Sequence, residues 1–325
     1  MLGSVYWVRP RIEQTYCMKG NIMRDWLIKF CKHVNNAKIV CDSDKVFDVY
    51  HYTSPEAAKS ILADGKIRLT DRYYLNDYSD GRYVLQLCLD NIDKLIENNT
   101  VLKNRFIEVL NKRKYCIQRD NFYVYQCSFS MKRDSLCMWN YYTKGNGIQG
   151  YCVHFSFDNT KDIGSQILIP EIAFEDEKQK IYSGKIIYNK ERQLEIVKGL
   201  VDYFLDFQMS NNEDFVLEYL VDKIIQQGIF FKKDCFSVEE EYRLAIIQFI
   251  DNSGNFYAIK DKREFYVKNG MFVPYVDISF DGDKLTEIMI SPTLEDKIVQ
   301  QSIKMLCADK YKNLQITSSE IPVRY

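Results

Sequence analysis

The sequence predicts an α+β protein, with a mixed, mainly antiparallel sheet flanked by helices. Alternating strand patterns recur at separated places, such as FYVYQCSFSM (122–131) and GYCVHFSF (150–157). Amphipathic helix patterns lie elsewhere along the chain, over residues 193–207 and 214–227. Because the two kinds of element are interspersed without regular strand–helix–strand repetition, a purely parallel sheet is not expected.

The chain is expected to form an N-terminal extension, residues 1–45, and a single α+β domain, residues 46–325. Its 325 residues are 46% hydrophobic and 27% charged, a composition that can bury a large core. The extension has no clear period apart from an amphipathic pattern around residues 22–33. Neither an internal repeat nor a low-complexity linker divides the rest.

The first elements of the domain have clear boundary signals. A strand is predicted over 46–52, and a helix follows with Ser54 as N-cap, Pro55 at its first position and Gly65 at its end. The elements expected next are a short strand over 67–69, a loop over 72–81 and a helix over 83–98.

The acidic segment FSVEEEYRLAI, residues 236–246, predicts a strand in the second half of the chain. Strand alternation would place Glu239, Glu241 and Arg243 on one face. Two neighbouring carboxylates raise each other's pKa unless a cation such as Arg243 or Lys232 compensates. The remaining expected elements are strands over 257–259, 273–278 and 285–290, a helix capped by Thr293 and an extended C-terminal segment.

Composition argues against several classes of protein. The chain has 44 basic and 45 acidic residues, so no overall field attracts it to nucleic acid or to an anionic membrane. No apolar run approaches the roughly 18 residues of a membrane span, and the start lacks the apolar region of a secretory signal. We therefore expect no membrane partner and a cytoplasmic location.

Metal and common nucleotide motifs are also missing from the sequence. Its 10 cysteines include no CxxC pair and accompany only 3 histidines, so no metal is expected and reduced thiols are. The glycine-rich nucleotide motifs, the serine-hydrolase elbow, the zinc-protease motif and the kinase catalytic motif do not occur.

Two candidate sites lie near the start of the domain. His51 and Thr53 end a strand that runs into a capped helix, whose free N–H groups favour an anion. A lone histidine in an apolar strand is more often a core residue. The Asn76-Asp77 pair lies in a tyrosine-rich loop, where a structural turn is the favoured interpretation.

Another candidate site is the stretch CSFSMKRDSLCMWNYYTKGNG. Ser128 and Ser130 would project from one strand face, and Trp139 and Tyr142 offer flat rings on which a base or a nicotinamide could stack. Aromatic residues at helical spacing are usually core. For the acidic segment, the alternative is a salt-bridged ladder on a surface strand.

Several of these stretches together resemble the bacterial family catalogued as domain of unknown function 2971. The stretches are YHYTSPEAAKSILADGKIRLTDRYYLNDYSDG, CSFSMKRDSLCMWNYYTKGNGIQGYCVHF, FFKKDCFSVEEEYRLAI, IMISPTLED and SSEIPVRY. They extend in order over nearly all of residues 46–325. The pieces FS-x4-DSL-x-MW-x2-Y and E-x-EYR are the most distinctive.

The arrangement is also similar to ADP-ribosyltransferases, in which a His or Arg, a Ser-x-Ser or Tyr, and a Glu lie on successive strands. Here His51, Ser128-Phe129-Ser130 and Glu239-Glu240-Glu241 occur in that order. The resemblance implies an ADP-ribosyltransferase-like fold and cleavage of the nicotinamide–ribose bond of NAD. One departure is the gap of about 110 residues between the last two motifs, which holds two predicted helices.

This resemblance assigns roles to individual residues. Glu241 would hold a ribose hydroxyl and stabilise positive charge, Glu239 would orient or deprotonate the acceptor, and His51 would position the ribose. The implied NAD-binding residues are His51, Thr53, Ser128, Ser130, Trp139, Tyr142 and Arg243. NAD would be a substrate, and whether the acceptor is a protein or a nucleic acid stays open.

Two other functions remain open at this stage. One is a non-catalytic sensor or protein-interaction module, in which the acidic segment is a salt-bridged strand. The other is an RNA-binding, DNA-binding or nuclease-like role that relies on the basic cluster Lys103, Arg105, Lys112, Arg113 and Lys114. That cluster is also typical of a solvated helix face.

Overall fold

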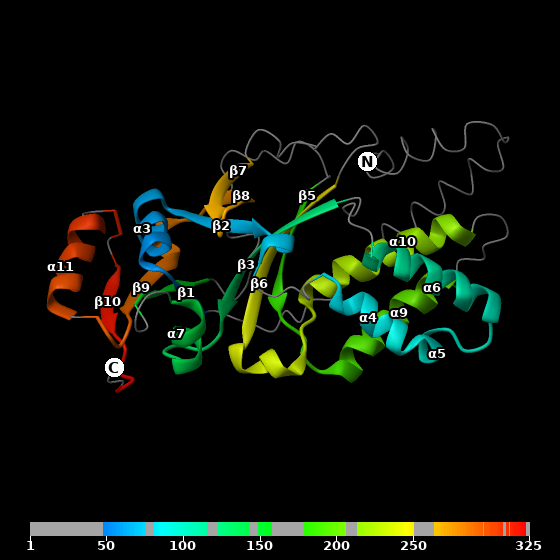
Figure 1. Ribbon diagram of the computed structural model, residues 1–325. Helices are drawn as coiled ribbons and strands as arrows, with labels where there is room; N and C mark the ends of the chain where they lie inside the picture. The colour runs from blue at the N-terminus through cyan, green and yellow to red at the C-terminus, as the bar shows by residue number, and fades with distance from the viewer. Residues whose placement is uncertain are drawn as a thin grey trace.

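The computed structural model describes residues 48–75, 81–115, 122–143, 149–157, 179–205, 213–249, 263–294, 296–307, 310–311 and 313–322. Its strands form a mixed, mainly antiparallel sheet flanked by helices, so the α+β class is confirmed (Figure 1). The expected helix over 22–33, the Asn76-Asp77 turn and the strand over 257–259 lie outside the described residues. The domain boundary at residue 45 stays a prediction.

The sheet is built around the long strand β3. Its order is β10-β9-β4-β1-β3-β2-β8-β7, while β6 pairs with β3 and β5 pairs with β6. Among the described strands, only β9 and β10 run parallel. The strands are β1 (Asp48–Thr53), β2 (Lys66–Asp71), β3 (Phe122–Ser130), β4 (Tyr151–Ser156), β5 (Gln179–Lys185), β6 (Glu241–Phe249), β7 (Glu264–Lys268), β8 (Met271–Ser279), β9 (Leu285–Ile290) and β10 (Gln315–Ser318).

Helices cover both faces of the sheet. The helices are α3 (Pro55–Asp64), α4 (Tyr83–Asp90), α5 (Ile92–Leu95), α6 (Thr100–Tyr115), α7 (Leu136–Tyr142), α9 (Lys190–Leu205), α10 (Glu213–Gln227) and α11 (Asp296–Cys307). On the face that we call A, α4 to α6, α9 and α10 pack against β3 and β6, and α7 packs against β1 and β4. The opposite face, B, is covered by α3 and α11. Figure 1 shows α4, α5, α6, α9 and α10 gathered at the end away from α3 and α11, whereas α7 lies beside β1.

The boundary signals of α3 are confirmed. The Ser54 hydroxyl accepts a hydrogen bond from the Ala57 N–H at 3.4 Å, and Pro55 opens the helix. Gly65 ends it with a φ of 67°, a left-handed conformation that favours glycine, and its N–H bonds the Ile61 carbonyl at 3.0 Å. The capping residues at both ends of α3 therefore define the helix that connects β1 and β2.

Two predicted elements were wrong in part. The strand expected over 236–246 begins only at Glu241, because residues 234–239 form a 3₁₀ helix, η4, and Glu240 has a left-handed φ of 41°. The helix expected over 83–98 breaks at Asn91, whose side chain donates to the Leu87 carbonyl at 2.8 Å. Side chains that bond nearby backbone groups compete with helix continuation.

The sheet divides beside β3, at a place that we call the fork. Along one edge, β3 pairs with β6 from Phe122 to Ser130. Along the other edge, it pairs with β2 at Tyr125 and Gln126 and with β1 at Ser130. On this edge the residues between, 127–129, have no partner among the described strands. The fork therefore leaves backbone groups of β3 for other partners.

Candidate functional site

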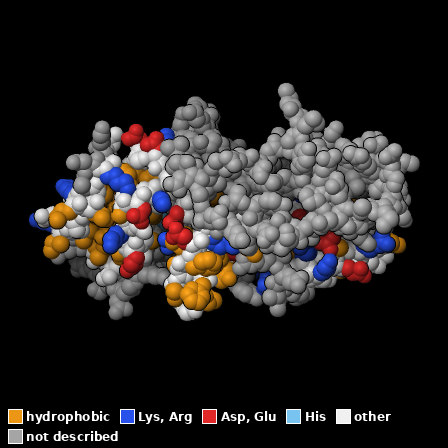
Figure 2. Space-filling view, turned by 90° about the horizontal axis from the view of Figure 1, so that it is seen from above, with side chains coloured by type: hydrophobic (Ala, Val, Ile, Leu, Met, Phe, Trp, Pro, Cys, Tyr) orange, Lys and Arg blue, Asp and Glu red, His pale blue; other side chains and the backbone are white. Residues whose placement is uncertain are grey.

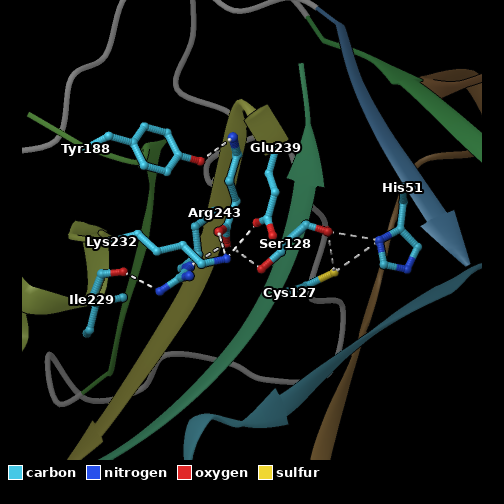
Figure 3. Close-up of polar contacts among 9 residues, drawn as sticks. His51, Cys127, Ser128, Tyr188, Ile229, Lys232, Glu239 and Arg243 are labelled. Atoms are coloured by element: carbon cyan, nitrogen blue, oxygen red, sulfur yellow. Dashed lines mark hydrogen bonds and ion pairs between the residues drawn. The ribbon is translucent and has the colours of Figure 1, made fainter. Parts of the chain in front are cut away.

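The pairing of β3 with β6 brings the predicted serines and acidic residues together. Ser128 lies opposite Arg243, and Ser130 lies opposite Glu241. Directly paired residues point to the same face of a sheet, so all four side chains lie on face A. Although Glu239 lies in η4 and not in the strand, its side chain reaches the same place (Figure 3).

Four side chains form a charged cluster: Lys232, Glu239, Glu241 and Arg243. The Lys232 ammonium donates to Glu239 Oε2 at 2.6 Å and to Glu241 Oε2 at 3.2 Å. The Arg243 guanidinium donates from Nε to Glu241 Oε1 at 2.7 Å and from Nη1 to the Ile229 carbonyl at 2.6 Å. Two cations therefore balance two anions in a buried place. The surface ladder that the sequence also allowed is wrong.

The cluster keeps Glu241 ionised. Burial raises the pKa of this carboxyl, but Arg243, Lys232 and the hydrogen bonds from Arg243 and Ser128 outweigh burial and lower the pKa to about 2. Burial lowers the pKa of Lys232, but the two glutamates outweigh it and raise the pKa above its ordinary value. The rise in pKa that a neighbouring carboxylate without a compensating cation would cause is therefore absent at Glu241.

Hydroxyl groups surround the two carboxylates. Ser128 Oγ donates to Glu241 Oε1 at 2.5 Å, and Ser130 Oγ donates to the Glu239 carbonyl at 2.7 Å. The hydroxyl of Tyr142, at the end of α7, bonds Glu239, and both burial and the negative charge of Glu239 raise its pKa. These contacts bring Ser128, Ser130 and Tyr142 together beside the two glutamates, while their assignment to NAD binding stays a prediction.

His51 lies on the other face of the sheet. Tyr50 pairs with Ser130 on face A, so the next residue, His51, points to face B. Its Nδ1 lies 3.0 Å from the Ser128 carbonyl and must carry the proton, since a carbonyl only accepts. Figure 3 shows His51 on the opposite side of Ser128 from the cluster. The resemblance implies one NAD site that includes His51, Ser130 and Glu241, and that grouping is wrong for His51, because the sheet separates it from the other two.

The His51 ring fills a structural need at the fork. The Ser128 carbonyl faces the edge of β3 where β1 and β2 separate, and the imidazole supplies its hydrogen bond. Burial lowers the pKa of His51, although the bond to Ser128 raises it, which favours the neutral ring. The nearby Cys127 thiol has a pKa raised to about 12, mainly by burial, so it is no activated nucleophile.

Two further residues expected to bind NAD, Trp139 and Thr53, are buried in the fold and take no part in the hydrogen bonds of the charged cluster. Trp139 is fully buried, its Nε1 donates to Asp134 Oδ1 at 2.8 Å, and its ring meets Tyr52 edge-on. No face of this indole is open for stacking, so its assignment to a bound ring is wrong. Thr53 is buried at the end of β1, away from the contacts of the charged cluster.

Sequence reasoning missed the residues that hold the cluster in place. Gln193 of α9 is fully buried, and its Nε2 donates to the carbonyls of Ile187 at 2.6 Å and Lys232 at 2.9 Å. The Tyr188 hydroxyl accepts from the Glu241 N–H at 3.0 Å. Lys232 itself was considered only as a compensating charge. No local pattern marks Gln193, because its partners come from distant segments.

The described residues offer neither a metal centre nor a membrane span. Within these ranges, no group of three or more His, Cys, Asp and Glu side chains could hold a metal ion. The helices of the described part are too short or too polar to cross a bilayer. What the cluster offers chemically is an ionised carboxylate, a second carboxylate two residues earlier and adjacent hydroxyl donors.

The fold and the site define an α+β protein with a buried, charge-paired cluster of acidic and basic residues on one face of its sheet. Residues 138–244 match the family model described as "Protein of unknown function (DUF2971)", so the resemblance to that family is confirmed over this segment. The matched segment begins within α7, at residue 138, and includes all four members of the charged cluster. Comparison with curated proteins and with solved structures gives no significant match.

Proposed function

We propose that the protein is a bacterial enzyme that cleaves the bond between nicotinamide and ribose in NAD, with the charged cluster as its active site. The carrying observation is that Glu241 lies beside Ser128 and Tyr142 and that its cationic partners lower its pKa to about 2, so that it is ionised near neutral pH. A fixed negative charge can stabilise the oxocarbenium-like state that forms as nicotinamide leaves. We place this activity in the cytoplasm, where its thiols stay reduced.

The chemistry balances with water or another nucleophile as acceptor. The C1′–N bond breaks, its electron pair stays on the pyridine nitrogen, and neutral nicotinamide leaves. The acceptor oxygen then bonds to C1′ and gives its proton to the Glu239 carboxylate, which passes it to solvent. Glu241 would meanwhile accept a hydrogen bond from a ribose hydroxyl.

In this proposal, a substrate would approach the cluster past Tyr142 and Ser128. Both residues are partly exposed, whereas Glu241 is only 2% exposed. A substrate would therefore displace the bond that Tyr142 makes with Glu239 before it met either carboxylate. His51, Thr53 and Trp139 have no part in this version of the site.

The second candidate function is a non-catalytic sensor or interaction module. The observation that favours it is the balance of charge: Lys232 and Arg243 already satisfy the carboxylates of Glu239 and Glu241. Such a cluster can serve the fold alone, since buried ion pairs often persist without a catalytic role. The two candidates differ in whether any NAD is consumed.

The nucleic-acid alternative loses support because several of its basic residues are paired within the protein. Lys103 lies 2.6 Å from Asp93, and Lys112 lies 2.8 Å from Glu218. Arg113 pairs with Asp222. These contacts indicate a helix surface that packs against α10 and the α5 region, with less charge available for phosphates.

NAD labelled in both the nicotinamide and the adenosine parts tests the proposal. The wild-type protein should release nicotinamide, and Glu241→Gln should lower the rate about a hundredfold or more. Glu240→Gln is the matched control, since Glu240 is a partly exposed neighbour that pairs with Lys132 at 3.0 Å, and it should keep the wild-type rate.

Ser128→Ala supplies a second variant in case Glu241→Gln does not fold. It removes the hydroxyl that bonds Glu241 while leaving the charges balanced, and it should also slow nicotinamide release. Wild-type protein that releases no nicotinamide above a blank would refute the enzyme and favour the non-catalytic module. Equal rates in wild type and both site variants would move the chemistry away from the cluster.

A further inference from the structure

The hairpin of β7 and β8 carries exposed apolar side chains at one end of the sheet. Phe265 and Val267 of β7 are 58% and 68% exposed, and Phe272 of β8 is 73% exposed. Val267 lies directly opposite Phe272, so the three side chains lie on one face and form what we call the hairpin patch. Figure 2, seen from above, shows groups of exposed hydrophobic side chains (orange) among the described residues.

The outer edge of β7 is a second feature of the same hairpin. β7 ends the strand order and pairs, within the described part of the chain, only with β8. Its sequence is Glu264-Phe265-Tyr266-Val267-Lys268. An edge strand with three consecutive β-forming residues at its centre is a template for another strand unless something covers it.

We propose that β7 pairs antiparallel with β7 of a second copy of this chain, about a two-fold axis at Tyr266. This register follows from the strand's own sequence. It sets Glu264 opposite the partner's Lys268 and Phe265 opposite the partner's Val267, and symmetry repeats both pairs. Every charged residue then meets its opposite charge, and every exposed apolar residue meets another.

The pairing also joins the two hairpin patches. In each copy, Phe272 lies beside Val267, and Val267 lies beside the partner's Phe265. The apolar side chains thus form one strip across the interface in place of two separate exposed patches. A different partner strand would need its own acidic and basic ends in this order, whereas a second copy supplies them by symmetry.

Sedimentation velocity of the full chain from about 1 to 100 μM tests the proposal together with charge-reversal variants. Wild type should dimerise. Glu264→Lys and Lys268→Glu each place like charges opposite one another at two positions, so each should weaken the dimer about tenfold or more. The double variant Glu264→Lys/Lys268→Glu restores opposite charges and should recover wild-type association.

The double variant also separates charge pairing from local damage. Glu264 accepts a hydrogen bond from the Tyr275 hydroxyl at 2.5 Å, which Glu264→Lys loses in both the single and the double variant. Recovery in the double variant would therefore assign the effect to the pairs between copies. A monomeric wild type, or a dimer that neither single variant weakens, would overturn the proposal. Neither result depends on NAD cleavage.

Discussion

Glu241 shows how much one buried charge can depend on its partners. Its two oxygens accept from Ser128, Lys232 and Arg243. Glu241→Gln leaves two buried cations with one anion, so the free energy of unfolding should fall by about 3–5 kcal/mol. Urea denaturation measures this. Glu240→Gln, at a partly exposed ion pair, should change the free energy of unfolding by less than about 1 kcal/mol, and similar losses in both variants would contradict the assignment.

The same carboxylate predicts a pH dependence of stability. The pKa of Glu241 is about 2 in the folded protein and 4.5 as its ordinary value. A lowered pKa stabilises the fold above the ordinary value, and this contribution, about 3 kcal/mol, is lost as the pH falls from about 5 to 2. The difference between wild type and Glu241→Gln in urea should therefore shrink between pH 6 and pH 3. A constant difference would argue against an ionised Glu241.

At this scale the sequence predicted part of the site and wrongly assigned His51, Thr53 and Trp139 to it. Alternation predicted that Ser128 shares a face with Ser130 and that Glu241 shares a face with Arg243, and the pairing of β3 with β6 brings both pairs to the same face. It could not place His51, because the register of β1 against β3 decides which face a residue of β1 meets. Tyr50, not His51, pairs with Ser130.

The loop before α7 depends on Asp134, a non-glycine residue with a φ of 53°. Its carboxylate accepts from Trp139 Nε1 at 2.8 Å, Ser319 Oγ at 2.6 Å and the Glu320 N–H at 2.8 Å, which joins α7 to the segment after β10. Asp134→Ala should lower the free energy of unfolding by about 2–3 kcal/mol and speed amide exchange at Glu320.

Asp134→Asn is the matched variant for this element. Asparagine tolerates left-handed backbone and keeps an oxygen for Trp139 and Ser319, so it should cost less than half as much. Equal losses from Ala and Asn, or unchanged exchange at Glu320, would mean that the segment after β10 is held by other contacts. Hydrogen exchange followed by mass spectrometry separates these results.

Two glycines differ in the space around them, so replacing them with alanine should have opposite effects on stability. A Cβ at Gly150 would lie 2.5 Å from the Thr53 carbonyl and 2.6 Å from Thr143 Cγ2, so Gly150→Ala should destabilise the protein by about 2 kcal/mol or more. Gly199 lies in α9 with open space around it, and Gly199→Ala should stabilise by about 0.5–1 kcal/mol. Thermal unfolding compares them, and a neutral Gly150→Ala would contradict the packing.

Element prediction succeeded where boundary residues act locally and failed where distant segments decide. Ser54 and Gly65 define α3 through their own caps. In contrast, η4 interrupts an apparently continuous strand pattern, because its residues turn back toward Lys232 and the cluster. The strands β5 and β7 carry no clear alternation and were missed. Their pairing with β6 and β8 makes them strands.

For the whole molecule, the class was predictable and the topology was not. Strand and helix patterns indicate an α+β protein, but they carry no information on which strands become neighbours. The observed order places β1 and β2, which follow each other closely in sequence, on different parts of the same edge of β3. Among the described residues, three separate hydrophobic clusters result, two of them on face A.

The long separation between β3 and β6 has a consequence for synthesis of the protein. Ser128 and its partner Glu241 are 113 residues apart. At about 5–20 residues per second, a ribosome needs roughly 5–25 s to make the intervening chain. During that interval the edge of the nascent β3 lacks its partner strand β6. The apolar side chains of Phe122 and Val124 also lack α9 and α10, which pack against them in the folded protein. Holding chaperones should therefore engage the growing chain in this window and release it once β6 emerges.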